Sequence, residues 1–75
     1  MIPPLTKDIA NYCKEVGVAL LVSKYGLILD LLNYNENDNE FSIIGGNRGE
    51  YLEGASWMTP HEYALKFLIK NAEDK

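Results

Sequence analysis

The sequence predicts an α+β domain in which a helix is followed by a three-stranded antiparallel meander and then by a second helix. Three observations support this order: an amphipathic stretch near the N-terminus, three central segments rich in β-branched, aliphatic and aromatic residues, and a helix-capping sequence before the last apolar stretch. Because the chain has 75 residues, we expect a single domain spanning residues 1–75, with a small core and a narrow margin of stability.

The first helix is predicted over residues 6–16. Thr6 is a suitable N-cap, and Gly17 stands where helices commonly end. Charged and amide side chains occupy one side of the predicted helix, so the opposite side is expected to pack on a core. That apolar side consists of Ile9, Tyr12, Cys13 and Val16.

The central segments 18–23, 27–34 and 40–44 are predicted to be the three strands, the last two forming a hairpin. Residues 24–26 and 35–39, which separate them, have the composition of turns. The second strand is apolar on both faces. Two helices packed on one face of this sheet would therefore leave an exposed apolar face opposite, of the kind that usually marks an interaction site.

A mostly helical fold with one short β-hairpin is the alternative, because the apolar residues of segment 18–32 also fit a helical stripe. Gly17 and Gly26 oppose a continuous helix there, and a lone strand at residues 41–44 would leave its backbone groups unpaired. Residues 50–53 are a candidate for an additional short edge strand.

The last helix is predicted over residues 59–72. Thr59 and Glu62 form a capping box, and Met58 and Tyr63 are placed to form the hydrophobic staple around it. More than half of the circumference of this helix is apolar, so it is either covered on two sides or turned toward a partner. The side chains expected to face such a partner are Leu65 and Ile69.

The negative charge is concentrated in the middle of the chain. Residues 27–53 carry six carboxylates against Arg48 alone, a net charge of −5, whereas the remaining residues carry five carboxylates and six lysines, a net charge of +1. A field of this sign repels nucleic acid and attracts basic protein surfaces. The six central carboxylates are Asp30, Glu36, Asp38, Glu40, Glu50 and Glu53.

The sequence predicts no enzyme activity, no metal site and no cofactor. His61 is the only histidine and Cys13 the only cysteine, and together they cannot build a usual zinc site or a nucleophile with its base. The acidic run of residues 33–40 lacks the glycine and the spacing of a calcium loop. Cys13, on the apolar side of the first helix, is expected to be a buried, inert thiol.

The composition favours a cytoplasmic protein with no membrane contact. A single cysteine fits a reducing compartment, the N-terminus does not have the pattern of a signal peptide, and the longest apolar runs are too short to cross a bilayer.

One loop resembles a nucleic-acid-binding element. Gly46-Asn47-Arg48-Gly49 follows an aliphatic segment and resembles the GxxG loop of KH domains, which implies single-stranded nucleic-acid binding through that loop. Against this hypothesis, the acidic residues Glu50 and Glu53 follow at once and Gly54 interrupts any helix after the loop.

The leading functional hypothesis is a non-enzymatic protein-binding domain that engages a larger protein with a basic surface. In size, charge and element order the chain resembles the small acidic inhibitors encoded by phages and mobile elements, including anti-CRISPR proteins, which implies blockade of a nucleic-acid-binding surface. A self-associating structural or regulatory homodimer is the alternative. Trp57 is included as a candidate hot spot. The candidate partner-binding residues are Asp30, Glu36, Asp38, Glu40, Glu50, Glu53, Trp57, Leu65 and Ile69.

Overall fold

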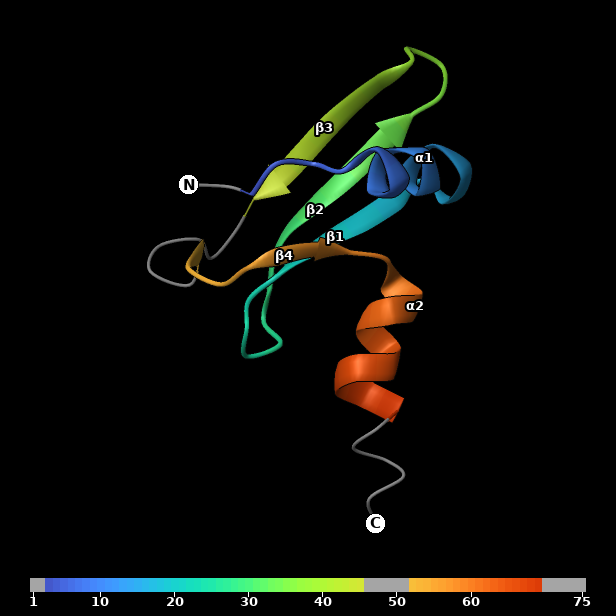
Figure 1. The fold of residues 1–75 in the computed structure, drawn as a ribbon. Coiled ribbons are helices and arrows are strands. Elements are labelled where there is room, and N and C mark those ends of the chain that lie inside the picture. Colours follow the sequence, from blue (N-terminus) through green and yellow to red (C-terminus); the bar gives the residue numbers. More distant parts are fainter. Residues whose placement is uncertain (1–2, 46–51, 70–75) are drawn as a thin grey trace.

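The structure, a computed structural model, describes residues 3–45 and 52–69. It has α+β architecture, with an N-terminal helix, a four-stranded antiparallel sheet and a short C-terminal helix (Figure 1). The elements are α1 (Lys7–Val16), β1 (Val18–Val22), β2 (Ile28–Asn35), β3 (Glu40–Gly45), β4 (Ser56–Met58) and α2 (Pro60–Tyr63), which continues as a π-helical segment, η2 (Ala64–Ile69).

The first helix has the ends that the sequence predicts. The side chain of Thr6 accepts a hydrogen bond from the amide of Ile9 at 3.2 Å, which satisfies one of the free donors of the first turn. Gly17 ends the helix with a φ of 103° and donates its amide to the carbonyl of Cys13 at 2.7 Å. This left-handed residue turns the chain directly from α1 into β1.

The predicted meander of three strands is present, and the mostly helical alternative is wrong for residues 18–32. Strands β1 and β2 form a hairpin whose tight turn places Gly26 at a φ of 92°, and β2 pairs with β3 in the same antiparallel sense. Gly17 before β1 and Gly26 after it both adopt left-handed conformations, which a continuous helix through this segment could not contain. Residues 18–22 instead pair with β2 as a strand.

A fourth strand, which the meander lacks, lies on the other side of β1. The sheet order is β3-β2-β1-β4, and Leu20 and Val22 of β1 face Met58 and Ser56 of β4. The edge strand expected at residues 50–53 is therefore displaced to residues 56–58. Leu52 to Gly54 form a helical turn instead, and residues 50–51 lie outside the described residues.

The two helices cover opposite faces of the sheet, so the prediction that both pack on one face is wrong. Cys13 of α1 packs on Ala19 and Leu32, whereas Tyr63 and Phe67 pack on the opposite face. The reason is that β1 is apolar on both faces, and each face needs its own cover. The second cluster comprises Leu20, Val22 and Met58, with Leu31, Tyr63 and Phe67 packed against it.

The start of α2 is fixed by its cap and by the turn before β2. The side chain of Thr59 accepts from the amide of Glu62 at 3.0 Å, and the predicted staple is present because Met58 and Tyr63 pack in one cluster. Glu62 pairs with Lys66 at 3.4 Å rather than closing the capping box. The hydroxyl of Tyr63 donates to the carbonyl of Gly26 at 3.2 Å, which ties the helix to the β1–β2 turn.

Candidate protein-binding edge

Strand β3 forms an exposed edge of the sheet. It pairs with β2 on one side, no described residue pairs with its other side, and all six of its residues are exposed. Three of them are large apolar residues: Phe41 is 38% exposed, Ile43 45% and Ile44 58%. An edge strand of this composition offers unpaired backbone groups and apolar side chains together.

The pairing of β2 shows which backbone groups of β3 point outward. The amide of Tyr34 donates to the carbonyl of Gly17, toward β1, so its neighbours Asn33 and Asn35 point toward β3. Their partners in β3 are Ser42 and Glu40. The backbone N–H and C=O groups of the alternate residues Phe41 and Ile43 therefore face the open edge.

The two faces of β3 differ in chemistry. Phe41 and Ile43 lie on the α1 face, where the Phe41 ring packs at 5.0 Å from the ring of Tyr34 and the ammonium of Lys14 lies 5.9 Å from its centroid. Glu40 and Ile44 share the other face. Because α2 and η2 pack against β1 and β4 on that face, they leave it exposed beside β3.

The tip of the β2–β3 hairpin is acidic and ordered by its own side chains. The side-chain NH2 group of Asn35 donates to the Asp38 carboxylate at 2.9 Å, and the side-chain oxygen of Asn35 accepts from the backbone amide of Asn37 at 3.0 Å. Asn39 adopts the left-handed conformation with a φ of 55°, and its side chain accepts a hydrogen bond from the hydroxyl of Tyr34. These local bonds fit the turn-forming chemistry expected of this segment.

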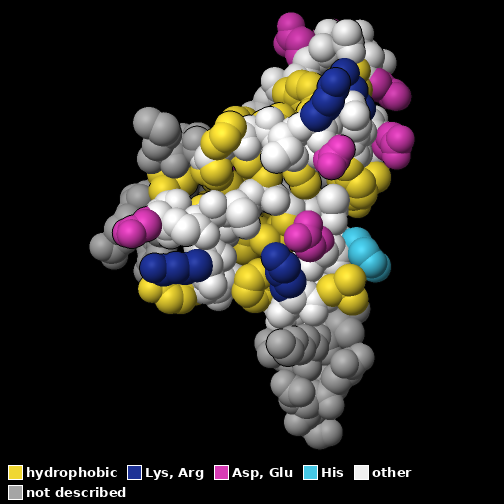
Figure 2. Space-filling view, in the orientation of Figure 1, with side chains coloured by type: hydrophobic (Ala, Val, Ile, Leu, Met, Phe, Trp, Pro, Cys, Tyr) yellow, Lys and Arg dark blue, Asp and Glu magenta, His cyan; other side chains and the backbone are white. Residues whose placement is uncertain are grey.

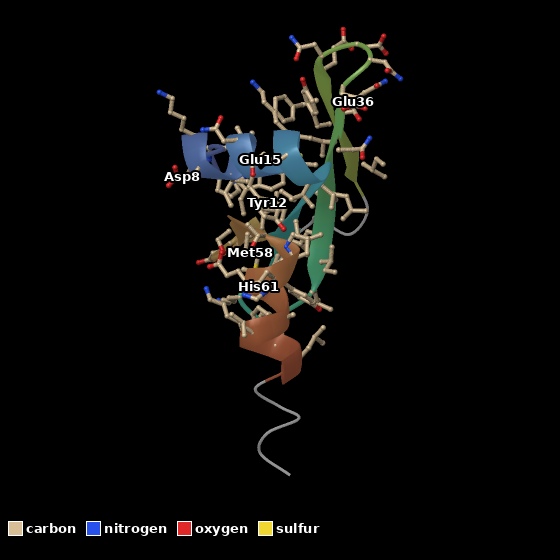
Figure 3. All side chains as sticks on the ribbon, turned by 90° about the vertical axis from the view of Figure 1, so that its right-hand side faces the viewer. Asp8, Tyr12, Glu15, Glu36, Met58 and His61 are labelled. Carbon is tan, nitrogen blue, oxygen red and sulfur yellow. The ribbon has the colours of Figure 1, made fainter. Side chains whose placement is uncertain are left out.

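Three of the six predicted carboxylates come together at this tip. Glu36, Asp38 and Glu40 are exposed, and none of them forms an ion pair with a described residue. Figure 3 places Glu36 at the end of the hairpin remote from α2, and acidic side chains gather at the same end of the molecule in Figure 2. We call Glu36, Asp38 and Glu40 the acidic tip.

The other predicted carboxylates do not join the acidic tip, so the acidic middle of the chain is not one surface. Asp30 is 1% exposed, and it lies in β2 between Leu21 of β1 and Gly45 of β3, on the same face as Leu32. Glu53 is exposed and precedes Gly54, which lies close to Lys24 in the β1–β2 turn. This turn and the acidic tip are at opposite ends of β2, and a strand of eight residues separates them by about 25 Å. Glu50 lies outside the described residues, as does the predicted KH-like loop of residues 46–49.

The predicted apolar and aromatic partner residues are also dispersed. Trp57 is half-buried in the cluster beneath α1, and its indole N–H donates to the carbonyl of Pro3 at 2.9 Å. Leu65 is 49% exposed, and Leu68, which the sequence did not single out, is 55% exposed. The side chain of Ile69 lies outside the described residues.

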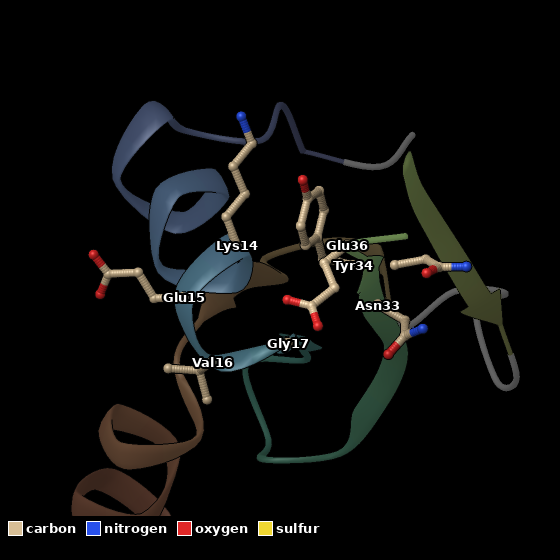
Figure 4. Close-up of a pocket in the computed structure, with 8 residues that line it drawn as sticks. Lys14, Glu15, Val16, Gly17, Asn33, Tyr34 and Glu36 are labelled. Atoms are coloured by element: carbon tan, nitrogen blue, oxygen red, sulfur yellow. The ribbon is translucent and has the colours of Figure 1, made fainter. Parts of the chain in front are cut away.

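An open pocket of about 410 Å³ lies between the end of α1 and the end of β2 (Figure 4). Its lining includes Lys14 and Glu15 from the helix and Tyr34 and Glu36 from the strand. The pocket adjoins the acidic tip and extends the polar surface from the hairpin onto α1.

The single cysteine and the single histidine of the chain lie in different helices, Cys13 in α1 and His61 in α2. Burial raises the pKa of the Cys13 thiol, which donates to the carbonyl of Leu32 at 3.5 Å. His61 is exposed in the first turn of α2. Among residues 3–45 and 52–69, no three His, Cys, Asp or Glu side chains are grouped so that they could hold a metal ion.

No protein-family model, curated protein or solved structure matches this chain. Within the part of the chain that the structure describes, no helix is long and apolar enough to span a membrane.

Proposed function

We propose that this chain is a non-enzymatic protein-binding domain that docks through the β2–β3 hairpin onto a basic surface of a larger protein. One observation carries the proposal: the acidic tip lies directly beside an exposed strand that presents Phe41, Ile43 and Ile44. The carboxylates of the acidic tip form no ion pair with a described residue, so they can speed the encounter with a basic surface, and neighbouring apolar side chains supply the area that holds the complex.

Inhibition is the form that this function takes when the basic surface belongs to a nucleic-acid-binding protein. The carboxylates of the acidic tip would then occupy the positions of phosphates and exclude the nucleic acid by competition. This proposal agrees with the resemblance of the chain, in size and charge, to small acidic phage-encoded inhibitors. It requires no catalytic group in the chain.

The test compares two charge-matched triple variants in affinity capture from the lysate of the natural host. One variant carries Glu36→Gln, Asp38→Asn and Glu40→Gln; the control carries Asp8→Asn, Glu53→Gln and Glu62→Gln, three exposed carboxylates elsewhere. We expect the first variant to lose a protein that the wild type retains at low salt, and the control to keep it. Equal retention by both variants would contradict the proposal.

Self-association is the second candidate function, and the open edge of β3 is the observation that favours it. Two copies related by a two-fold axis at Ser42 would place Phe41 of one β3 opposite Ile43 of the other, on the same face of a continuous sheet. Sedimentation equilibrium at millimolar concentration tests this arrangement, and a monomer there excludes it.

A further inference from the structure

We propose that β3 is a receptor strand: an extended basic segment of the partner adds to its open edge as a fifth, antiparallel strand, with its carboxyl end at the acidic tip. This inference rests on the proposed function and states how the partner is bound. Addition of a strand to a sheet edge is a common mode of peptide recognition, in which backbone hydrogen bonds give affinity and alternate side chains give specificity.

The first argument is that the described part of this edge lacks three of the features by which proteins usually protect an edge strand: proline, lysine and a β-bulge. The sequence of β3 contains no proline and no lysine, and its register with β2 runs without a bulge from Asn35 and Glu40 to Asp30 and Gly45. The outward N–H and C=O groups of Phe41 and Ile43 are therefore available to an added strand.

The second argument concerns the charge of the occupant. The acidic tip places Glu40 at the first position of β3, with Glu36 and Asp38 just before it in the hairpin loop. An antiparallel strand runs opposite to β3, so its carboxyl end reaches these carboxylates. Lysine or arginine at that end would pair with them, whereas acidic residues there would be repelled.

The third argument concerns the side chains of the added strand. On the α1 face its residues would lie beside Phe41 and Ile43, which favours β-branched or aromatic residues there. On the other face they would lie beside Glu40, Ser42 and Ile44, which favours basic or polar residues near Glu40 and Ser42 and an apolar residue beside Ile44. The partner segment is thus expected to alternate apolar with polar residues and to end in basic ones.

A second copy of this chain is a less suitable occupant of the β3 edge than a basic strand. In the two-fold arrangement about Ser42, Glu40 of one copy lies opposite Ile44 of the other, and the described strand that would pair, Glu40–Gly45, brings no lysine or arginine to the acidic tip. A basic strand compensates the same carboxylates directly, so the charge favours it as the occupant.

The test uses two synthetic peptides and two variants at one position. The probe peptide alternates Val with Thr and ends in three lysines, and its control carries the three lysines at the amino end. Ile43→Pro removes an N–H that points away from β2, so it blocks the edge without removing a bond of the sheet. Ile43→Thr keeps that N–H and removes only apolar surface.

We expect the wild type to bind the probe peptide more tightly than the control peptide in an NMR titration. Ile43→Pro should weaken binding of the probe by about tenfold or more, since it removes one backbone bond and obstructs its neighbour, while Ile43→Thr should stay within about threefold of the wild type. Addition of the probe to the wild type should slow hydrogen exchange at the amides of Phe41 and Ile43, a result that does not depend on how well the proline variant folds.

The other outcomes separate the two proposals. If Ile43→Pro binds the probe like the wild type while the acidic-tip triple variant does not, docking by charge stands and strand addition is overturned. If the probe and control peptides bind equally, or neither binds, the basic strand is overturned as the occupant. Protection of Phe41 and Ile43 that rises with protein concentration, without peptide, would overturn it in favour of a second copy.

Discussion

Strands β1 and β3 belong to one sheet and are both rich in apolar residues, yet their environments are opposite. In β1, Ala19, Leu21 and Val22 are completely buried, because β2 and β4 flank the strand and α1 and α2 cover its two faces. In β3 every residue is exposed, because β2 flanks one side only and neither helix covers it fully. Because β1 is central in the sheet it forms the core, and because β3 is at the edge it is exposed, although both strands are rich in apolar residues.

The largest difference in stability is expected when a large side chain in each of the two strands is replaced by alanine. Leu21→Ala, at a completely buried position, should lower the free energy of unfolding by about 2–5 kcal/mol, since it removes packing and leaves a cavity. Ile44→Ala, at a position that is 58% exposed, should cost about 1 kcal/mol or less. Urea unfolding followed by circular dichroism measures both, and equal losses would show that β3 is buried as well.

A smaller effect is expected at the glycines that flank β1. A side chain at Gly26, with a φ of 92°, would also meet the ring of Phe67 at 2.8 Å, whereas nothing lies within 4 Å of the same position at Gly17, with a φ of 103°. Gly17→Ala should cost about 1–2 kcal/mol from the backbone alone, and Gly26→Ala more. The same denaturation assay checks the order, and a smaller loss at Gly26 would mean that η2 does not pack on this turn.

Local signals in the sequence were sufficient to predict where the two helices begin and where three of the four strands lie. Thr6 and Thr59 cap their helices through their own side chains, and Gly17 and Gly26 adopt positive φ, so each of these features depends on a few neighbouring residues. The alternation in β2 was also predictable, with Asp30 and Leu32 on one face and Leu31 on the other.

The arrangement around the sheet was not predictable, because it depends on contacts distant in the sequence. Strand β4 has only three residues, and it is a strand through its pairing with the second edge of β1. The burial of Asp30 depends on its place between β1 and β3, which the sequence around it does not show. The candidate site was therefore predicted in part: the charge of Glu36, Asp38 and Glu40 was clear, but not that an open edge lies beside them.

Amide hydrogen exchange of the free protein, resolved by NMR, tests the central claim most directly. We predict rapid exchange at Phe41 and Ile43, whose N–H groups face the open edge, and slow exchange at Ser42 and Ile44, whose N–H groups face β2. Alternate protection along β3, beside slow exchange at Leu21 in β1, would establish an unoccupied edge. Equal and strong protection of Phe41 and Ile43 in the dilute protein would contradict it.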